Sequence, residues 1–308
     1  MNTRTLTVET LIEKTKKKLQ DQIVYFYLNH GKEGEKRMQH VYHVFQKALE
    51  LNEFYNLGFP YEVLERTMLF HDSLKFFEED NYKKLKVKKT DLVHFNESSK
   101  TWHALFAPYV LKEKIPEFTE EELTAIKYHT TGNSKMSNLG ELLFISDFLE
   151  DTRKIPLIFK NYKRYTIKEI VGLILKFKIE KNKKNLLHPL TIKAYETYKK
   201  YVDEKIYKLY AISDLIIETF VKDIVVYKMD KVTPFYDYSL IVTALSLRQL
   251  KACANLIRET FDISKIELGE EWVLIDLGDI VIHLFSSDAR ERYAIDKLYN
   301  DLDHFVIE

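Results

Sequence analysis

The chain has 308 residues, of which 45% are apolar and 31% are charged, with only 6 Pro and 8 Gly. This length and composition exclude a small disulfide scaffold and a long disordered chain, and they suit two domains better than one. The net charge of zero hides an asymmetry, because residues 206–308 hold 11 basic and 18 acidic side chains. The basic remainder suits a phosphate-rich ligand, and the acidic C-terminal part suits a basic partner.

The single cysteine, Cys253, excludes an internal disulfide framework and favours a reducing compartment. It lies on the apolar side of a predicted helix, where we expect it to be a buried small hydrophobe. The first segment, MNTRTLTVETLIEKTKKKLQ, is too charged for the core of a signal peptide. No apolar run approaches the roughly 18 residues that span a bilayer. We therefore expect a cytoplasmic protein that does not enter a membrane.

The N-terminal part of the chain is predicted to be helical. Apolar residues recur there at three- and four-residue spacing, and strand-like alternation is nearly absent. Gly132 follows one helical run and is a plausible helix stop. The runs are residues 10–28, 40–51, 61–77, 120–131 and 137–149. We expect an all-α domain over residues 1–204.

The remaining residues, 205–308, are predicted to form a small mixed α/β domain. Short β-branched runs, typical of strands, alternate there with amphipathic runs. A longer apolar stretch with Gly278 at its break indicates two strands or one long bent strand. The expected order is helix 212–223, strands 223–229 and 239–245, helix 246–261, two strands within 272–285, and helix 289–302. A single continuous helix can form the joint between the two domains.

Six residues in the helical part form a candidate metal-binding set. Imidazole and carboxylate ligands suit first-row divalent metals that keep open coordination positions, and the absence of a thiolate disfavours a structural zinc site. One carboxylate can bridge two cations, and two cations support phosphoryl chemistry by activating water and neutralising phosphate charge. The six are His40, His71, Asp72, His103, His129 and Asp147.

Three cationic side chains lie near these residues in the sequence. Lys75 follows Asp72 by three residues, Arg37 precedes His40 by three, and Arg153 follows Asp147 by six. Each can meet a phosphate oxygen, although each taken alone is also an ordinary solvated charge. A single adjacent His-Asp pair likewise occurs often by chance. The six candidate ligands in this order, each within a matching local phrase, are hard to explain in that way.

Those phrases resemble the YqeK family of HD-domain proteins, which hydrolyse diadenosine tetraphosphate symmetrically to two ADP. They are RMQHVYHVF, LFHDSLKF, WHALFAPYVL, AIKYHTTGNSKMSNLGELLFISDFLEDTR and LHPLTIKAY. The resemblance implies that the six residues hold two divalent transition-metal ions, of which iron is expected and manganese or cobalt is compatible. It implies phosphate contacts by Lys75 and Arg153, with Asp72 also catalytic. It further implies that Arg37, Thr130, Thr131 and Gly132 bind or shape the pocket for substrate.

The chain departs from this family at three places. Ser146 stands where an alanine usually precedes the last ligand, and His43 stands where a small residue is usual. Glu150-Asp151-Thr152-Arg153 replaces the usual Glu-Pro-Gly-Arg. None of these changes removes a proposed ligand, so the expectation of metal binding is unaffected.

Residues from about 207 to 303 resemble the ribosomal silencing factor family, RsfS. The phrases are DIVVYKMDKVTPFYDYSLIVTALSLRQLKACANLI and EEWVLIDLGDIVIHLFSSDARERYAIDKLYND. The resemblance implies docking on a large-subunit ribosomal protein at the face that meets the small subunit, which would block subunit joining. Trp272 and Tyr293 have the character of interface anchors, with a polar rim at Asp276, Asp279, Arg290 and Arg292. Trp272 as a core residue is an equally compatible interpretation.

Two other functions stay open on the sequence. The helical domain can be an HD hydrolase of a cyclic dinucleotide, a guanosine polyphosphate or a deoxynucleotide, since pocket shape sets the substrate. Alternatively, the chain can be a ribosome-binding regulator whose helical domain senses a nucleotide without hydrolysing it. The α/β part has no nucleotidyltransferase motif, and direct DNA binding is not expected.

Overall fold

The computed structural model describes residues 10, 12–13, 15–182 and 187–307. The chain divides into two compact units, the first made of Met1–Lys154 with Lys163–Val202, and the second of Ile155–Tyr162 with Asp203–Glu308. The expected junction between residues 204 and 205 lies close to the last crossing between the units. The placement of residues 155–162 in the second unit is a feature that no sequence pattern indicated.

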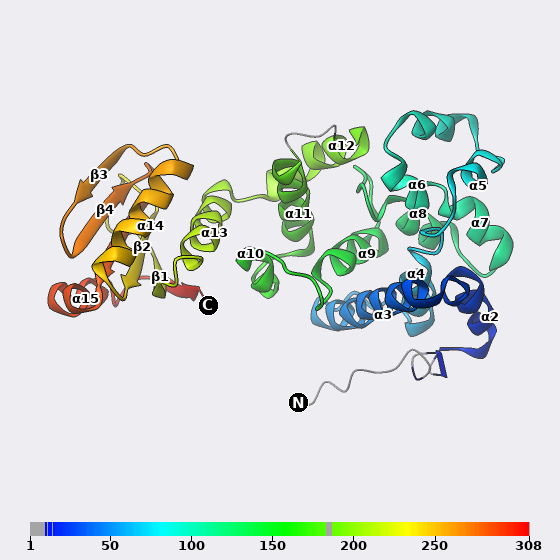
Figure 1. Cartoon of the computed structure of the whole chain (residues 1–308), viewed down its shortest axis with the longest axis horizontal. Helices are drawn as coiled ribbons and strands as arrows, with labels where there is room; N and C mark the ends of the chain where they lie inside the picture. Colours follow the sequence, from blue (N-terminus) through cyan, green and yellow to red (C-terminus); the bar gives the residue numbers. More distant parts are fainter. Residues whose placement is uncertain (1–9, 11, 14, 183–186, 308) are drawn as a thin grey trace. The chain divides into compact units, whose positions relative to one another are not determined.

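The described residues of the first unit are helical and contain no strand, so the all-α prediction is confirmed (Figure 1). The α-helices are α2 (Lys17–Phe26), α3 (Gly31–Phe54), α4 (Tyr61–Phe70), α5 (Glu79–Lys83), α6 (Trp102–Leu105), α7 (Ala107–Lys114), α8 (Glu120–Tyr128), α9 (Asn138–Leu149), α11 (Ile167–Lys181) and α12 (Pro189–Tyr198). The 3-10 helices are η1 (Leu28–His30), η2 (Lys89–Asn96), η3 (Ser99–Thr101), η4 (Tyr162–Arg164, which begins in the second unit) and η5 (Lys199–Tyr201).

Helix α9 is the centre of the first unit, because it packs against α3, α8 and α11. Its residues are buried on nearly every side, as the continuous apolar run LLFI predicts. Side-chain caps fix where the neighbouring helices begin. Thr119 and Glu122 form a reciprocal capping box at the start of α8, and Ser137 caps α9. These caps set the register at which the functional side chains emerge.

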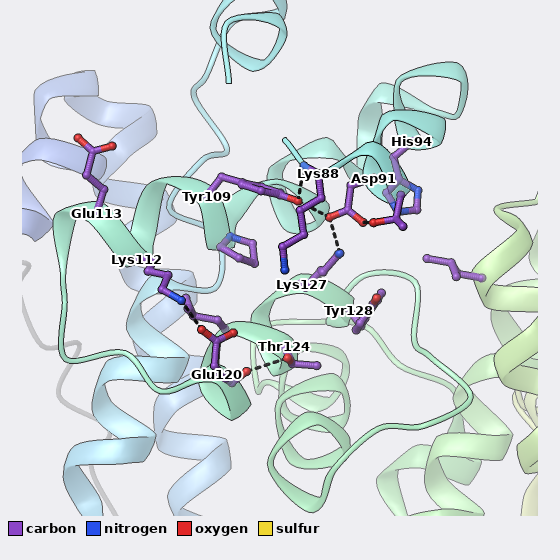
Figure 2. Close-up of a pocket in the computed structure, with 14 residues that line it drawn as sticks. Lys88, Asp91, His94, Tyr109, Lys112, Glu113, Glu120, Thr124, Lys127 and Tyr128 are labelled. Carbon is purple, nitrogen blue, oxygen red and sulfur yellow. Dashed lines mark hydrogen bonds and ion pairs between the residues drawn. The ribbon is translucent and has the colours of Figure 1, made fainter. Parts of the chain in front are cut away.

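A cavity of about 770 Å³ lies beside α7, α8 and η2 in the first unit (Figure 2). Its wall carries both charges and aromatic rings. Tyr109 donates its hydroxyl to Asp91 at 2.6 Å, and Lys127 Nζ lies 2.7 Å from the same carboxylate oxygen. The charged groups of this wall therefore partly neutralise one another.

A buried polar cluster adjoins this cavity at His94. One oxygen of Glu97 lies 2.7 Å from His94 Nδ1 and 2.6 Å from His188 Nε2. The amide of Leu190 donates to His188 Nδ1 at 3.2 Å, so the proton of a neutral His188 ring is on Nε2 and faces Glu97. Through Glu97, the cluster therefore brings η2 and the start of α12 into close polar contact.

The second unit contains a six-stranded mixed sheet in the order β3-β4-β5-β2-β1-β6. Its strands are β1 (Lys222–Lys228), β2 (Tyr238–Ala244), β3 (Lys265–Leu268), β4 (Trp272–Asp276), β5 (Ile280–Ser286) and β6 (His304–Ile307). Its helices are α10 (Leu157–Lys160), α13 (Glu204–Ile217), α14 (Leu247–Thr260), α15 (Ser287–Tyr293) and α16 (Ile295–Leu298). Strands β2 and β5 pair in parallel, and the other pairs are antiparallel. The predicted mixed α/β domain is confirmed.

The two parallel strands form the core of this unit, since almost every residue of β2 and β5 is buried. Ile241 and Phe285 cluster with Ala289 of α15. Their neighbours in sequence face the opposite side of the sheet by strand alternation, and α14 packs against the same strands. Cys253 of α14 is fully buried, as expected, and burial raises the pKa of its thiol to about 11.

Two edge strands and one helix break were not predicted. Strand β3 is largely exposed and contains charged residues, and β6 has only four residues, so neither shows a clear alternating pattern. The predicted helix over residues 289–302 is interrupted at Ala294, whose φ is +50°. None of the helices in the described parts of the chain combines the length and the apolar character needed to cross a bilayer.

Candidate metal centre

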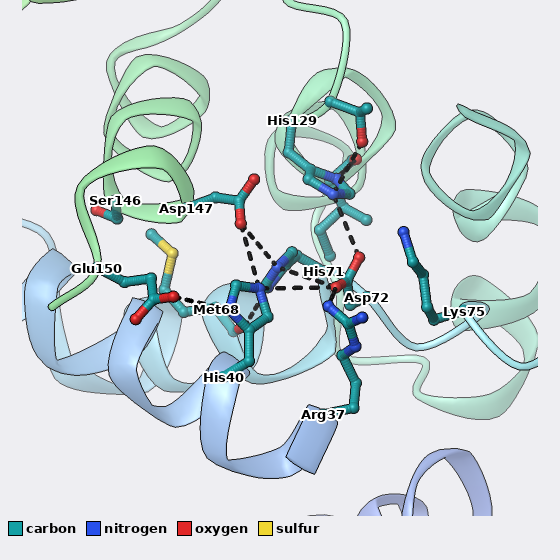
Figure 3. A network of polar contacts seen from close by, with 12 residues as sticks. Arg37, His40, Met68, His71, Asp72, Lys75, His129, Ser146, Asp147 and Glu150 are labelled. Atoms are coloured by element: carbon teal, nitrogen blue, oxygen red, sulfur yellow. Dashed lines mark hydrogen bonds and ion pairs between the residues drawn. The ribbon is translucent and has the colours of Figure 1, made fainter. Parts of the chain in front are cut away.

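The six predicted ligands come together from five helices of the first unit. His40 lies on α3, His103 on α6 and Asp147 on α9, while His71-Asp72 and His129 directly follow the last residues of α4 and α8. All six are buried except His40 and Asp147, which are partly buried. Figure 3 shows Asp72 in the middle of this group, with His40, His71 and Asp147 on one side and His129 on another.

Two of the imidazoles are held by the same local arrangement. His71 Nδ1 lies 2.7 Å from the Met68 carbonyl, and His129 Nδ1 lies 2.8 Å from the Ile126 carbonyl. Each ring thus donates to the carbonyl three residues earlier, at the end of a helix. This hydrogen bond assigns the proton to Nδ1 and leaves the lone pair of Nε2 directed into the site, as in metal-ligating histidines.

The two oxygens of Asp72 face two different groups of imidazoles. Oδ2 lies 3.7 Å from His40 Nε2 and 3.8 Å from His71 Nε2. Oδ1 lies 3.1 Å from His103 Nε2 and 3.5 Å from His129 Nε2. Asp72 therefore joins two ligand clusters through one carboxylate.

The remaining carboxylate completes the first of these clusters. Asp147 Oδ1 lies 3.2 Å from His40 Nε2 and 3.8 Å from His71 Nε2. Both of these imidazole nitrogens are buried and have no hydrogen-bond partner among the described residues. Buried unpaired nitrogens cost free energy unless another group occupies their lone pairs. The donor set fits a divalent cation at this position.

Two residues that the sequence did not single out support this cluster. Glu150 is buried, and its Oε1 lies 3.5 Å from His40 Nδ1, on the side of the ring away from the site. Thr152 donates its amide at 2.9 Å and its hydroxyl at 2.7 Å to the Glu150 carboxylate. A carboxylate behind an imidazole ligand orients the ring and raises its basicity. The only sequence signal for these two positions was the segment Glu150-Asp151-Thr152-Arg153, where the chain departs from the family pattern.

Strong electrostatic coupling shifts the pKa values of the cluster. Burial alone lowers the pKa of His40, but the nearby carboxylates of Asp147 and Glu150 raise it to about 9. Burial alone raises the pKa of Asp147, but close contact with His40 and the charge of Arg153 bring it well below its ordinary value. Burial lowers the pKa of His71 to about 3, so its imidazole is neutral, which is the form that binds metals.

The predicted cations surround the centre. Arg37 lies 2.7 Å from Asp72 Oδ2, and Arg153 lies 2.7 Å from Asp147 Oδ1. Lys75 is exposed, and its Nζ lies 3.5 Å from His103 Nε2. It also lines a cavity of about 440 Å³ that reaches His103.

The residues predicted to bind or shape the pocket after α8 are of two kinds. The Thr130 hydroxyl lies 3.1 Å from His129 Nε2 and 3.4 Å from His103 Nε2, so it faces the second cluster. Thr131 is buried and donates to the Gly132 carbonyl at 2.9 Å, which supports the turn. Gly132 has a φ of +69°, a conformation that favours glycine. Ser146 is tolerated inside α9 because its hydroxyl bonds the Leu142 carbonyl at 2.7 Å.

In the second unit, the predicted anchors stack with one another. The Trp272 ring lies 5.0 Å from the rings of Phe285 and Tyr293 and 5.7 Å from His283. Trp272 is partly buried, whereas Tyr293 is 52% exposed. Trp272 therefore belongs in part to the core, and Tyr293 covers it on the surface.

The predicted rim residues differ in how many internal contacts hold their side chains. Arg290 is committed internally, with contacts of 2.9 Å to Asp296 and 2.8 Å to the Thr243 hydroxyl. Asp279 pairs with Lys208 at 2.6 Å, and Asp276 accepts the Gly278 amide at 2.8 Å. Arg292 is exposed and pairs with Glu271 at 3.0 Å, so it is the rim cation most available to a partner.

The fold and the site define a two-domain protein, in which a helical domain with a His/Asp centre precedes a mixed α/β domain. Residues 203–308 match the family model described as "Ribosomal silencing factor during starvation". The ribosomal silencing factor RsfS of Bacillus subtilis is 37% identical over 87 residues, which cover 26% of this chain and 74% of that relative. Through its second unit, the chain belongs to the ribosomal silencing factor family.

The N-terminal region matches a different group of proteins. The symmetrical bis(5'-nucleosyl)-tetraphosphatase of Halalkalibacterium halodurans is 30% identical over 125 residues, or 40% of this chain. The match spans 65% of the length of that relative. A crystal structure from Clostridium acetobutylicum, described as a predicted HD superfamily hydrolase involved in NAD metabolism, is 22% identical with a TM-score of 0.48 and covers 58% of this chain and 96% of that one. The predicted joining of these two kinds of region in one chain is confirmed.

Proposed function

We propose that the first unit hydrolyses diadenosine tetraphosphate symmetrically to two ADP in a metal-dependent reaction. The observation that carries this proposal is the position of Asp72, whose two oxygens face separate imidazole clusters. Such a carboxylate suits a pair of divalent cations. The similarity of the N-terminal region to proteins named symmetrical bis(5'-nucleosyl)-tetraphosphatases supports the choice of substrate.

In this proposal, each cluster holds one cation. His40, His71, Asp72 and Asp147 would hold the first, and His103 and His129, with Asp72, would hold the second. Iron is the expected metal, and manganese or cobalt suits the same ligands. The cations, when bound, supply Lewis acidity for attack of water on phosphorus.

The side chains around the clusters handle the substrate's charge. Arg37 and Arg153, already paired with Asp72 and Asp147, present N–H groups to phosphate oxygens, and Lys75 adds a cation beside His103. The water oxygen adds to one of the two central phosphorus atoms, and the oxygen that bridged them leaves with the other half. Consumption of one water thus produces two ADP.

Product analysis tests this reaction directly. The metal-loaded chain is incubated with diadenosine tetraphosphate, and the nucleotides are separated by chromatography. ADP is the expected sole product, with turnover lost in His71→Ala and reduced at least about ten-fold in Lys75→Met. His43→Ala is the matched control, because His43 lies on α3 near His40, and among the described residues no hydrogen bond or ion pair joins it to the six candidate ligands.

The other possible results separate the competing functions. ATP plus AMP would reject symmetric cleavage. Hydrolysis of a cyclic dinucleotide, a guanosine polyphosphate or a deoxynucleotide in place of diadenosine tetraphosphate would assign another HD substrate. Binding without turnover of any of these, with iron, manganese or cobalt, would favour the nucleotide-sensing regulator.

We propose further that the second unit docks on a protein of the large ribosomal subunit and thereby blocks subunit joining in the cytoplasm. Membership of the ribosomal silencing factor family supports this role. The exposed ring of Tyr293 and the charge of Arg292 offer contacts, and Trp272 supports Tyr293 from beneath. The acidic charge of this region suits a basic ribosomal partner.

Cosedimentation with purified large subunits tests docking. Tyr293→Ala is expected to weaken binding by at least about ten-fold, as for an aromatic anchor. Tyr25→Ala is the control, since Tyr25 is also exposed but lies in the first unit. Equal binding by wild type and both variants would remove Tyr293 from the interface, and no binding by wild type would reject docking itself.

A further inference from the structure

Lys178 is a cation near the centre that neither the sequence motifs nor the proposed reaction uses. It lies in the last part of α11, which packs against α9. Its Nζ donates to the Thr130 carbonyl at 3.0 Å and lies 4.4 Å from the centre of the Phe144 ring. One backbone acceptor and one aromatic face hold the ammonium group in place, and neither of them neutralises its charge.

The charge of Lys178 is close to the Asp147 end of the centre. Burial lowers the pKa of Lys178 to about 8, while the charges of Asp147 and Arg153 act on it in opposite directions. Lys178 therefore remains mostly cationic at neutral pH. Its Nζ lies over the ring of Phe144, which precedes Asp147 by one turn on the same face of α9. No ion pair within 4.0 Å joins Lys178 to a carboxylate in the described parts of the chain.

The cations around the centre fall into two pairs. On the Asp72 side, Arg37 contacts Asp72 and Lys75 lies beside His103. On the other side, Arg153 contacts Asp147, and Lys178 lies over Phe144, one turn before Asp147 on α9. A cationic pair on either side of the ligand clusters matches an extended anion whose reacting bond is near its middle.

We propose that Lys178 binds phosphate oxygens of the substrate and forms, with Arg153, a second cationic subsite at the Asp147 end of the centre. A polyphosphate chain then passes from the Arg37–Lys75 side to the Arg153–Lys178 side, with its central bond at the ligand clusters. This inference rests on the proposed hydrolase function and identifies a further specificity-determining residue for it. Lys178 has three N–H donors and uses one of them on Thr130, so two remain for phosphate.

Binding and kinetics of full-length variants test the role of Lys178. The variants are Lys178→Met, which removes the charge, and Lys178→Arg, which keeps it. Lys181→Met is the control, because Lys181 lies on the same helix one turn later, over Phe177. Calorimetry measures the Kd of inorganic tripolyphosphate for the metal-loaded proteins, and hydrolysis of diadenosine tetraphosphate gives KM and kcat.

Lys178→Met is expected to raise the tripolyphosphate Kd and the KM by about ten-fold, with a smaller change in kcat, as for loss of a charge-assisted hydrogen bond. Lys178→Arg is expected to recover most of the affinity, and Lys181→Met to resemble wild type. An unchanged Kd and KM in Lys178→Met would overturn the inference. So would an equal effect of Lys181→Met, or a loss of stability and metal content with unchanged Kd, which would mean that Lys178 only ties α11 to Thr130.

The same measurements keep the two proposals apart. If wild type hydrolyses no dinucleotide but Lys178→Met weakens tripolyphosphate binding, the proposed reaction fails and the phosphate subsite stands. If wild type produces ADP and Lys178→Met leaves KM unchanged, the subsite fails and the proposed reaction stands.

Discussion

Glu150 is positioned to act on the metal through His40 without touching the metal itself. Its carboxylate is held by Thr152 and faces His40 Nδ1. Glu150→Gln is expected to lower metal affinity by about 10–100-fold, because it removes the charge that orients and polarises the ring. Competition with a fluorescent chelator measures this affinity. Asp151→Asn is the control, since Asp151 is exposed and pairs with Lys47; equal losses in both variants would contradict a specific role for Glu150.

His283 in β5 makes the stability of the second unit depend on pH. Both of its ring nitrogens are buried without a hydrogen-bond partner among the described residues, and burial lowers its pKa from 6.5 to about 4. Below pH 6.5 the unfolded chain takes up a proton that the folded unit does not accept. Stability is therefore lost as pH falls from 6.5 to about 4, by an amount on the order of 3 kcal/mol.

Urea unfolding of the full-length chain at a series of pH values measures this effect, with Trp102→Phe as the background so that the fluorescence reports on Trp272 alone. His283→Phe is expected to flatten the dependence between pH 6.5 and 4, since it removes the titrating group and keeps an aromatic ring in the stack. An unchanged slope in the variant would assign the pH dependence to other groups.

At the level of residues, the sequence predicted the six candidate ligands that the fold brings together, but not all of the residues that surround them. His71-Asp72 and the YHTTG segment mark positions in the chain, and the fold brings His129 Nε2 to within 3.5 Å of an Asp72 oxygen. Glu150 lies within the phrase that contains YHTTG but was not assigned a contact there, and Lys178 lies outside every such phrase. Glu150 reads as a charge that ends a helix, and Lys178 is one of many lysines on an amphipathic helix. Their roles depend on distances across helices, which a single sequence does not give.

The turn after α8 is the element on which the second ligand cluster depends. Gly132 has a φ of +69°, and a Cβ built there would lie 3.2 Å from Leu175 Cδ2 and 3.4 Å from Ala194 Cβ. Gly132→Ala is expected to cost more than about 1 kcal/mol of stability and to weaken metal binding, because the turn carries Thr130 and follows His129. Chemical unfolding and metal titration of the same preparation measure both effects.

Gly58→Ala provides a matched control for backbone strain. Gly58 also has a positive φ, of +74°, but nothing lies within 4 Å of a Cβ built there. The Gly58→Ala variant is expected to lose only about 1 kcal/mol of unfolding free energy and to bind metal as wild type does. If both variants lose the same stability and the same metal affinity, close packing around Gly132 has no role.

At the level of elements, the sequence predicted those that bury an apolar face. The helices around α9 and the buried strands β2 and β5 follow regular apolar patterns, and Gly278 correctly divides β4 from β5. Strand β3 was missed because its side chains are mostly exposed, so pairing with β4 and not burial defines it. The break at Ala294 was missed because alanine favours helix in every sequence pattern.

At the scale of the whole chain, metal is expected to stabilise one unit and leave the other unchanged. All six proposed ligands belong to the first unit. Metal at 100 times its Kd adds about 2.7 kcal/mol to the stability of the unit that binds it. Calorimetry with and without a chelator is therefore expected to shift the transition of the first unit and not that of the second. A parallel shift of both would show that the units unfold together.

The path of the chain between the two units has a consequence for how this protein can be divided. Residues 155–162 belong to the second unit although they precede the last part of the first. In α10, Leu157, Ile158 and Phe159 are buried, and the Leu157 amide donates to Asp214 of α13 at 3.0 Å. If the chain were cut, or its gene divided, near residue 203, these apolar side chains would stay on the fragment that carries the first unit. The interleaved chain thus fixes the two halves in a one-to-one ratio through synthesis, damage and turnover.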